Sequence, residues 1–275
     1  MARCRSGGGR LSAGLPWRPG DAGAKPAVAS GNAGKQAIIG LSVAPAFGNH
    51  CQAAVGVSPP PGDETLGVGG LLAATRAVGG EVRVVAVSAG EAGDPEGRFD
   101  EPAAHLRSGE LCRALAVLGI EDLVQWYEPD GDCQDSSGLR RRIRQMIDSY
   151  GPDWILAPSP LERHRDHVAV AEAAICAWQA SATEAELFLY EVSQPVAATH
   201  VVDVTPWQDR KRKALSVYRL PLAYCDYETI SRSLMAYRAH CLAPGAQAVE
   251  ALQRVDRAQG LRLLAAMRRL REAME

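Results

Sequence analysis

The segment 158–167, Pro-Ser-Pro-Leu-Glu-Arg-His-Arg-Asp-His, concentrates side chains that can do chemistry. Glu162, His164, Asp166 and His167 fall within six consecutive residues. Neutral imidazole binds zinc well, and a neighbouring carboxylate can hold a ligand histidine in the tautomer that binds metal. A charged helix start is the alternative interpretation, because exposed backbone N–H groups stabilise an acid such as Asp166. Two histidines beside an aspartate favour the functional interpretation.

A second segment, 58–70, has the sequence Ser-Pro-Pro-Pro-Gly-Asp-Glu-Thr-Leu-Gly-Val-Gly-Gly and places paired acids at the start of a predicted helix. A capping arrangement also explains these acids, with Asp63 as the N-cap residue and Glu64 in the first turn. Taken alone, this segment does not distinguish a site from a cap.

The elements that must position these segments alternate along the chain from about residue 52. Apolar runs predict strands, and apolar residues at helical spacing predict helices between them. Four such strand–helix repeats predict an α/β fold with a mostly parallel sheet and helices on both faces. In such sheets the site lies at the carboxyl ends of the strands, so the two segments are expected to meet there. The predicted strands are 53–58, 82–88, 122–127 and 154–157, and the predicted helices are 64–78, 101–118, 138–150 and 164–180.

Composition excludes several classes of function. The 275 residues include 30 Lys and Arg against 32 Asp and Glu, a formal charge of −2, whereas a nucleic-acid binder needs a basic surplus. No apolar run approaches the length of a transmembrane helix. Seven cysteines without a CxxC pair argue against a zinc knuckle or a thioredoxin-type motif and predict a reducing, cytoplasmic compartment.

The chain divides into three parts on composition. Residues 1–50 are rich in Gly, Ala and Arg and predict a disordered leader. Residues 51–252 carry the α/β pattern. Residues 253–275 form a predicted amphipathic helix with Leu263, Met267 and Leu270 on one stripe. Such a helix is expected to dock on its own domain, and the alternative is self-association through the same stripe.

Together the two segments resemble the PIG-L/LmbE family of zinc-dependent N-acetylglucosaminide deacetylases. The family has His-Pro-Asp-Asp-Glu-Thr followed by Leu-Gly-x-Gly-Gly after its first strand, and residues 64–70 match the later part. The second motif, Pro-Ser-x-x-x-x-His-x-Asp-His, is matched in full by residues 158–167. Arg107-x-x-Glu110 and Tyr218 also fit, so the resemblance extends over about residues 52–250.

The resemblance implies a Rossmann-like three-layer sandwich and a reaction that hydrolyses an N-acetyl group from a small amino-sugar substrate. By resemblance, His164 acts as an acid or stabilises an oxyanion, and Asp166 orients His167 or a substrate hydroxyl. The implied site consists of the metal ligands Asp63 and His167, the catalytic residues His164 and Asp166, and the substrate-binding residues Glu64, Glu162 and Arg163.

The chain departs from the family at two positions of the first motif. The metal-binding histidine is replaced by Pro60, and the general-base aspartate is replaced by Gly62. A catalytic zinc of this kind needs three protein ligands, and a positioned base contributes roughly 10²–10⁴-fold to the rate. The sequence therefore predicts that zinc binding is weak or absent and that hydrolysis is reduced or lost.

Two alternatives remain open at this point. The chain is a non-catalytic sugar-binding or scaffold protein, or it is an active hydrolase with a rearranged site that recruits Glu162 as the base. No histidine elsewhere replaces the missing ligand convincingly, because His50 precedes the first strand while His105 and His240 lie in or near helices.

Overall fold

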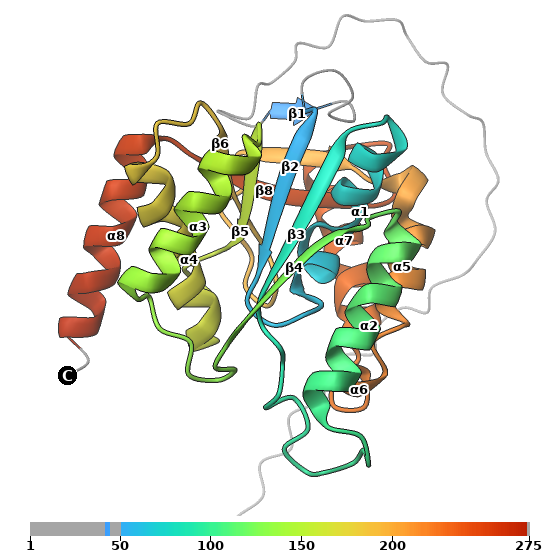
Figure 1. The fold of residues 1–275 in the computed structure, drawn as a ribbon. Helices are drawn as coiled ribbons and strands as arrows, with labels where there is room; N and C mark the ends of the chain where they lie inside the picture. The colour runs from blue at the N-terminus through green and yellow to red at the C-terminus, as the bar shows by residue number, and fades with distance from the viewer. Residues whose placement is uncertain (1–41, 45–50, 274–275) are drawn as a thin grey trace, which may run out of the picture. The chain divides into compact units, whose positions relative to one another are not determined.

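The computed structural model describes residues 42–44 and 51–273, and an eight-stranded sheet lies at its centre (Figure 1). The strand order is β1-β7-β8-β6-β5-β2-β3-β4, and only β8 runs antiparallel to its neighbours. The predicted mostly parallel sheet is thus confirmed. The strands are β1 (Ser42–Ala44), β2 (Ala53–Ser58), β3 (Glu81–Ser88), β4 (Asp122–Glu128), β5 (Trp154–Pro158), β6 (Glu186–Tyr190), β7 (His200–Asp203) and β8 (Val249–Val255).

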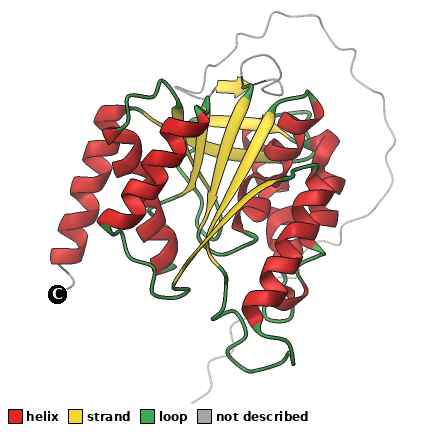
Figure 2. Cartoon of the chain, viewed as in Figure 1, coloured by secondary structure: helices red, strands yellow, loops and turns green. Residues whose placement is uncertain are grey.

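Helices cover both faces of this sheet, which confirms the three-layer architecture (Figure 2). One face carries α1 (Asp63–Ala77), α2 (Ala103–Leu118), α5 (Gln208–Leu215), α6 (Arg219–Leu222) and α7 (Tyr227–Leu242). The other face carries α3 (Ser137–Tyr150), α4 (Arg165–Ala180) and α8 (Arg257–Glu272). None of the helices in the described ranges combines the length and the apolar character that crossing a membrane requires.

The sheet is apolar on both faces because neighbouring side chains of a strand point to opposite sides. In β3, Val82 and Val84 pack into the core under α1 and α2, whereas Val85 and Val87 pack into the core under α3 and α4. All four side chains are buried, and burial of each contributes about 1.5–3 kcal/mol to stability. This two-sided core holds the carboxyl ends of the central strands in fixed positions.

Helix α1 lies unusually close to the sheet because glycines face it. A Cβ atom on Gly67 would lie 2.4 Å from the ring of Tyr190, and one on Gly70 would lie 2.7 Å from Val204. The helix is also kinked at Val68, where φ is −133°. The carboxylate of Glu250 in β8 accepts hydrogen bonds from the backbone N–H groups of Gly70 and of the next residue, each at 2.8 Å.

The predicted boundary between residues 252 and 253 is wrong, because it divides strand β8. That strand pairs with both β6 and β7 in the interior of the sheet. Helix α8 packs on α4 with Leu264 and Met267 buried, while Arg257 donates a hydrogen bond to the carbonyl oxygen of Trp178. The expected docking of this helix on its own domain is therefore what the structure has.

The predicted leader also requires a correction at three residues. Ser42–Ala44 form β1 and pair in parallel with β7, so they are part of the sheet. The rest of the segment 1–50 lies outside the described residues.

Candidate functional site

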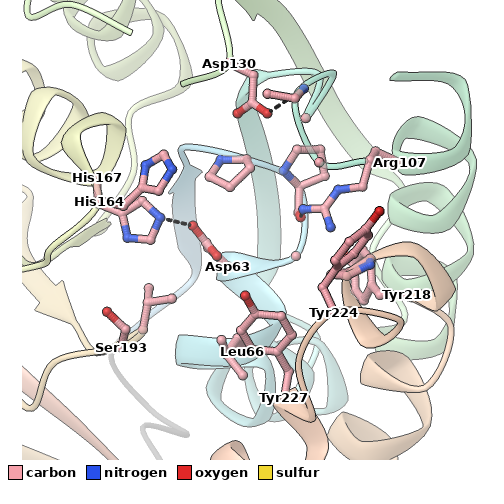
Figure 3. A pocket seen from close by; sticks show the side chains of 18 of the residues that line it. Asp63, Leu66, Arg107, Asp130, His164, His167, Ser193, Tyr218, Tyr224 and Tyr227 are labelled. Atoms are coloured by element: carbon pink, nitrogen blue, oxygen red, sulfur yellow. Dashed lines mark hydrogen bonds and ion pairs between the residues drawn. The ribbon is translucent and has the colours of Figure 1, made fainter. Parts of the chain in front are cut away.

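A pocket of about 520 Å³ opens at the carboxyl ends of the parallel strands (Figure 3). The loops after β2, β3, β4 and β5 all contribute to its wall, as expected for a site in a parallel sheet. The two segments singled out in the sequence meet here. The polar side chains that line it are Asp63, Arg107, Asp130, Arg163, His164, His167, Ser193, Tyr218, Tyr224 and Tyr227.

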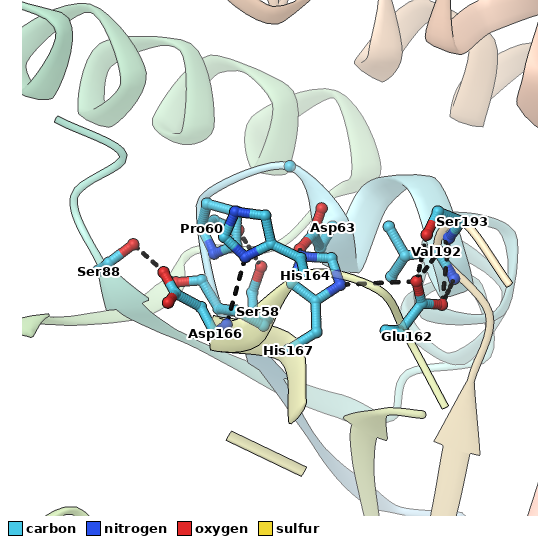
Figure 4. A network of polar contacts seen from close by, with 12 residues as sticks. Ser58, Pro60, Asp63, Ser88, Glu162, His164, Asp166, His167, Val192 and Ser193 are labelled. Atoms are coloured by element: carbon cyan, nitrogen blue, oxygen red, sulfur yellow. Dashed lines mark hydrogen bonds and ion pairs between the residues drawn. The ribbon is translucent and has the colours of Figure 1, made fainter. Parts of the chain in front are cut away.

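His167 lies between two carboxylates at the floor of the pocket (Figure 4). Its Nε2 atom is 2.9 Å from Oδ2 of Asp63, and its Nδ1 atom is 3.8 Å from Oε2 of Glu162. Burial disfavours the charged imidazolium, but the two carboxylates outweigh this and raise the pKa of His167 to about 10. The residues expected to bind metal are thus in contact with each other, and the imidazole carries a proton at neutral pH.

Glu162 lies beside His167, with its Oε2 atom 3.8 Å from Nδ1, and does not line the pocket. Its carboxylate is fully buried and accepts hydrogen bonds from the backbone N–H groups of Val192, Ser193 and Gln194 and from the Ser193 hydroxyl. Burial works against the charged form, yet the contact with His167 and these bonds lower the pKa of Glu162 to about 2. A carboxylate this strongly solvated by the protein is a poor proton acceptor, so the predicted roles in substrate binding and as a substitute base are not supported.

Glu64 is also buried, and its hydrogen bonds hold the loop after β2 rather than reaching into the pocket. Its carboxylate accepts hydrogen bonds from Ser58 Oγ at 2.8 Å, from Gly62 N at 2.9 Å and from the Tyr218 hydroxyl at 2.9 Å. The N-cap of α1 is Gly62, and Glu64 reaches back to its N–H as in a capping box. The interpretation of Asp63 as N-cap is therefore wrong, since its side chain faces His167 instead.

Asp166 is fully buried, and its carboxylate binds backbone N–H groups rather than His167, which was one of the two partners implied by the resemblance. Its two oxygens accept hydrogen bonds from the backbone N–H of Gly131 at 2.7 Å and of Cys133 at 3.1 Å. Asp166 is thus a positioning residue that ties the loop after β4 to the start of α4.

His164 and Arg163 are exposed and line the pocket, as a ligand-contacting role requires. The Nδ1 atom of His164 accepts a hydrogen bond from Asp166 N at 3.3 Å, so the neutral ring carries its proton on Nε2. The ring centre lies 5.0 Å from that of His167. His164 can therefore donate a hydrogen bond to a ligand oxygen.

Pro60 and Gly62 line the pocket without offering any side-chain donor atom. Gly62 has φ of +110°, a conformation that L side chains rarely adopt. Among residues 42–44 and 51–273, no group of three or more His, Cys, Asp or Glu side chains is arranged to hold a metal ion. The donor set around Asp63 and His167 therefore does not fit the three-ligand zinc site of the family.

Asp130 is a pocket residue to which sequence reasoning assigned no role. It accepts hydrogen bonds from the Ser88 hydroxyl at 3.0 Å and from Ala92 N at 3.1 Å. Burial raises the pKa of its carboxyl group above the ordinary value. Its position two residues after β4, at the same edge of the sheet as Asp63, is the signal that could have identified it.

Arg107 is a second such residue. It is 7% exposed, donates a hydrogen bond to the carbonyl oxygen of Pro61, and lies against the ring of Tyr218 at 5.9 Å. Glu110, one turn later on α2, accepts a hydrogen bond from Leu220 N at 3.1 Å, and burial raises its pKa. The Arg-x-x-Glu pattern noted in the sequence thus joins α2 to the pocket loop and to α6.

The fold is the mostly parallel α/β sandwich seen in PIG-L/LmbE-like deacetylases. Residues 55–178 match the PIG-L family, described as GlcNAc-PI de-N-acetylase. The match begins within β2, ends within α4 and includes both pocket loops. A comparison with curated proteins gave no match.

Solved structures share the fold. A conserved protein of Thermus thermophilus is 25% identical, with a TM-score of 0.64 over 74% of this chain and 93% of that one. The N,N'-diacetylchitobiose deacetylase of Pyrococcus horikoshii is 21% identical, with a TM-score of 0.64 over 77% of this chain and 85% of that one. The 4-carboxy-2-hydroxymuconate hydratase of Pseudomonas putida is 20% identical, with a TM-score of 0.65 over 74% of this chain and 96% of that one. One fold thus carries both a deacetylase and a hydratase, so the site must decide the reaction.

Proposed function

We propose that this chain binds an N-acetylated amino-sugar derivative in the pocket and is an N-deacetylase of reduced turnover. The observation that carries the proposal is the contact of Asp63 with His167 beside His164, at the junction of β2 and β5. The PIG-L match covers these residues and favours amide hydrolysis over the hydration carried out by one neighbour.

The residues present can perform part of an amide hydrolysis. His164 Nε2–H is placed to donate to the acetyl oxygen, which gains negative charge when water attacks the carbonyl carbon. Asp63 is held by His167 and exposes its carboxylate to the pocket, where it can accept a hydrogen bond from the amide N–H or a sugar hydroxyl. No side chain stands at Gly62 to take the proton of the attacking water, which alone costs roughly 10²–10⁴-fold in rate.

A second candidate function is ligand binding without turnover. It is favoured by the loop after β2, whose backbone carbonyls are all engaged although its catalytic side chains are missing. Pro59 O accepts from Ser88 N at 2.9 Å, Pro60 O from Ser58 Oγ at 2.5 Å, and Pro61 O from Arg107. The pocket therefore keeps its shape without the side chains of the motif.

We also propose a reducing, cytoplasmic compartment. The proposal is supported by the cysteines of the described ranges, which are all free.

Restoring the motif tests the proposal. The double variant Pro60→His with Gly62→Asp is expected to release acetate from an N-acetylglucosamine derivative at least 100-fold faster than the unaltered protein, and to retain more zinc after dialysis. The matched control Pro59→His places an imidazole one residue away, outside the pocket lining, and is expected to change neither quantity. Ordinary turnover by the unaltered protein would contradict reduced activity, and failure of all N-acetyl amino sugars to bind would contradict the substrate class.

A further inference from the structure

The pocket extends beyond its polar end to a second wall, which is mostly apolar. In Figure 3, His164 and His167 lie on one side of Asp63, and Tyr218 and Tyr224 lie on the other. We define this aromatic wall as Leu66 of α1 together with the side chains that the segment 218–227 contributes to the pocket. The members are Leu66, Tyr218, Pro221, Leu222, Tyr224 and Tyr227.

Two of the three tyrosine hydroxyls of this wall are already engaged. Tyr218 donates its hydroxyl to Glu64 at 2.9 Å, and Tyr224 donates its hydroxyl to Asp94. These two side chains therefore offer ring surface to the pocket rather than a free hydroxyl, and Tyr227 adds both a ring and a hydroxyl. Leu222, Tyr224 and Tyr227 remain partly exposed although each lines the pocket, so their apolar surface is open to a ligand.

The position of Tyr224 is fixed by the loop after β3. Besides the bond to Asp94, the guanidinium of Arg98 lies over the Tyr224 ring at 4.2 Å and donates a hydrogen bond to Ala223 O. The same loop also lines the pocket, with residues that have little or no side chain, Gly90, Ala92 and Gly93. We call the part of the pocket that the aromatic wall and this loop line the slot.

We propose that this slot binds a flat apolar group that the substrate carries in addition to its N-acetyl amino sugar. The inference rests on the proposed function, and the polar end of the pocket then takes the acetamido group. The polar end of the pocket gives the hydroxyl groups of a sugar their hydrogen-bond partners, whereas the aromatic wall offers mostly ring faces and aliphatic side chains. An aromatic aglycone fits the wall because ring faces stack favourably on one another.

Paired ligands of known structure test the inference without requiring turnover. Calorimetry would compare phenyl N-acetyl-β-glucosaminide with methyl N-acetyl-β-glucosaminide, and both with phenyl β-glucoside. We expect the phenyl N-acetyl ligand to bind about tenfold more tightly than the methyl one, since stacking and burial of one ring supply that much. The preference is expected to fall to about twofold in Tyr224→Ala.

Control variants separate the ring surface from the fold. Tyr224→Phe keeps the ring and is expected to keep most of the preference. Tyr237→Ala removes an exposed tyrosine of α7 that does not line the pocket, and is expected to leave both affinities unchanged. If Tyr224→Ala does not fold, Leu222→Ser tests the same wall, and circular dichroism checks each variant.

The outcomes distinguish this inference from the proposed function. Equal affinity for the methyl and phenyl N-acetyl ligands, or a preference that survives Tyr224→Ala and Leu222→Ser, would overturn the aromatic slot and leave the deacetylase proposal standing. Equal affinity for phenyl β-glucoside and its N-acetyl counterpart would overturn the proposed substrate class and leave the slot standing. Binding of none of the three would overturn both.

Discussion

The loop after β2 is held by its backbone, whereas the loop after β5 is held by its side chains. In the first, the carbonyl oxygens of Pro59, Pro60 and Pro61 accept hydrogen bonds from Ser88, Ser58 and Arg107. Proline side chains take no part in these bonds. The shape of this loop is thus independent of the two side chains that the family uses for chemistry.

In the loop after β5, the carboxylates of Glu162 and Asp166 hold the structure. Glu162 binds the segment 192–194, and Asp166 binds the loop after β4. Replacing either residue would disturb backbone far away in sequence. The two loops thus differ in the groups that hold them: backbone carbonyl oxygens in the first, and the carboxylates of Glu162 and Asp166 in the second.

The largest expected effect is on Glu162. Glu162→Ala removes a buried carboxylate, leaves three backbone N–H groups without their acceptor, and leaves the His167 imidazolium with Asp63 as its remaining carboxylate neighbour. We expect a loss of about 3–5 kcal/mol in the free energy of unfolding, measured by urea denaturation. Arg163→Ala, at the exposed neighbouring position, is expected to change it by less than about 0.5 kcal/mol. Similar values for the two variants would contradict the difference between the loops.

The pH dependence of stability tests the pairing across the two loops. Because the pKa of His167 is raised from 6.5 to about 10, its contribution is complete below pH 6.5 and is lost as the pH rises through 10. Because the pKa of Glu162 is lowered from 4.5 to about 2, its contribution is present above pH 4.5 and is lost as the pH falls through 2. In chelator-treated protein, the stability difference between wild type and His167→Gln should therefore shrink between pH 7 and 10, by at most about 1.4 kcal/mol per pH unit. If the stabilities of the two proteins changed equally with pH over this range, the raised pKa of His167 would be contradicted.

Asp166→Ala is expected to have a smaller but local effect. Loss of two hydrogen bonds to a buried carboxylate costs about 1–3 kcal/mol and releases the loop after β4 from α4. Amide hydrogen exchange at Gly131 and Cys133 should accelerate, while exchange in β2 stays unchanged. Uniform acceleration throughout the sheet would mean that Asp166 stabilises the whole domain rather than this loop.

Replacement of Gly62 is expected to have an effect of similar size to that of Asp166. Gly62→Ala places a side chain at φ of +110° and should cost about 1–3 kcal/mol from backbone strain, since the nearest atom to the new Cβ is a comfortable 3.5 Å away. Gly109→Ala within helix α2 is the matched control and should gain up to about 1 kcal/mol from helix propensity. Thermal unfolding would measure the stability of both variants. An unchanged stability of Gly62→Ala would show that the loop after β2 adapts its backbone.

Much of the fold was predictable because its central strands are continuous apolar runs. Strand β2 begins and ends at the predicted residues, and α4 begins one residue later than predicted. Strand β8 was not predicted, because Glu250, Gln253 and Arg254 interrupt its apolar pattern. Glu250 is nevertheless buried, since Lys211 Nζ lies 2.7 Å away and α1 supplies two N–H groups. Whether such a charged residue is buried in a strand depends on partners from distant segments, which the local sequence pattern does not reveal.

In the site, too, the position of the loops could be predicted but the contacts of their side chains could not. The meeting of the two loops followed from the rule that parallel strands carry their site at the carboxyl edge. The roles of Glu162 and Asp166 could not be predicted, because their partners are backbone groups about 30 or more residues away. Side-chain type and spacing are equally compatible with a carboxylate that faces a ligand and one that binds backbone.

The close approach of α1 to the sheet has a consequence for altering this protein. Gly67 and Gly70 leave no room for even a methyl group against Tyr190 and Val204, so α1 packs directly against these two side chains. Asp63 is in the first turn of this helix, so its backbone position depends on the packing of α1 against the sheet rather than on the surrounding pocket loops. Exchanges in the surrounding loops should leave that carboxylate in place, which makes the chain a tolerant framework for installing new reactivity.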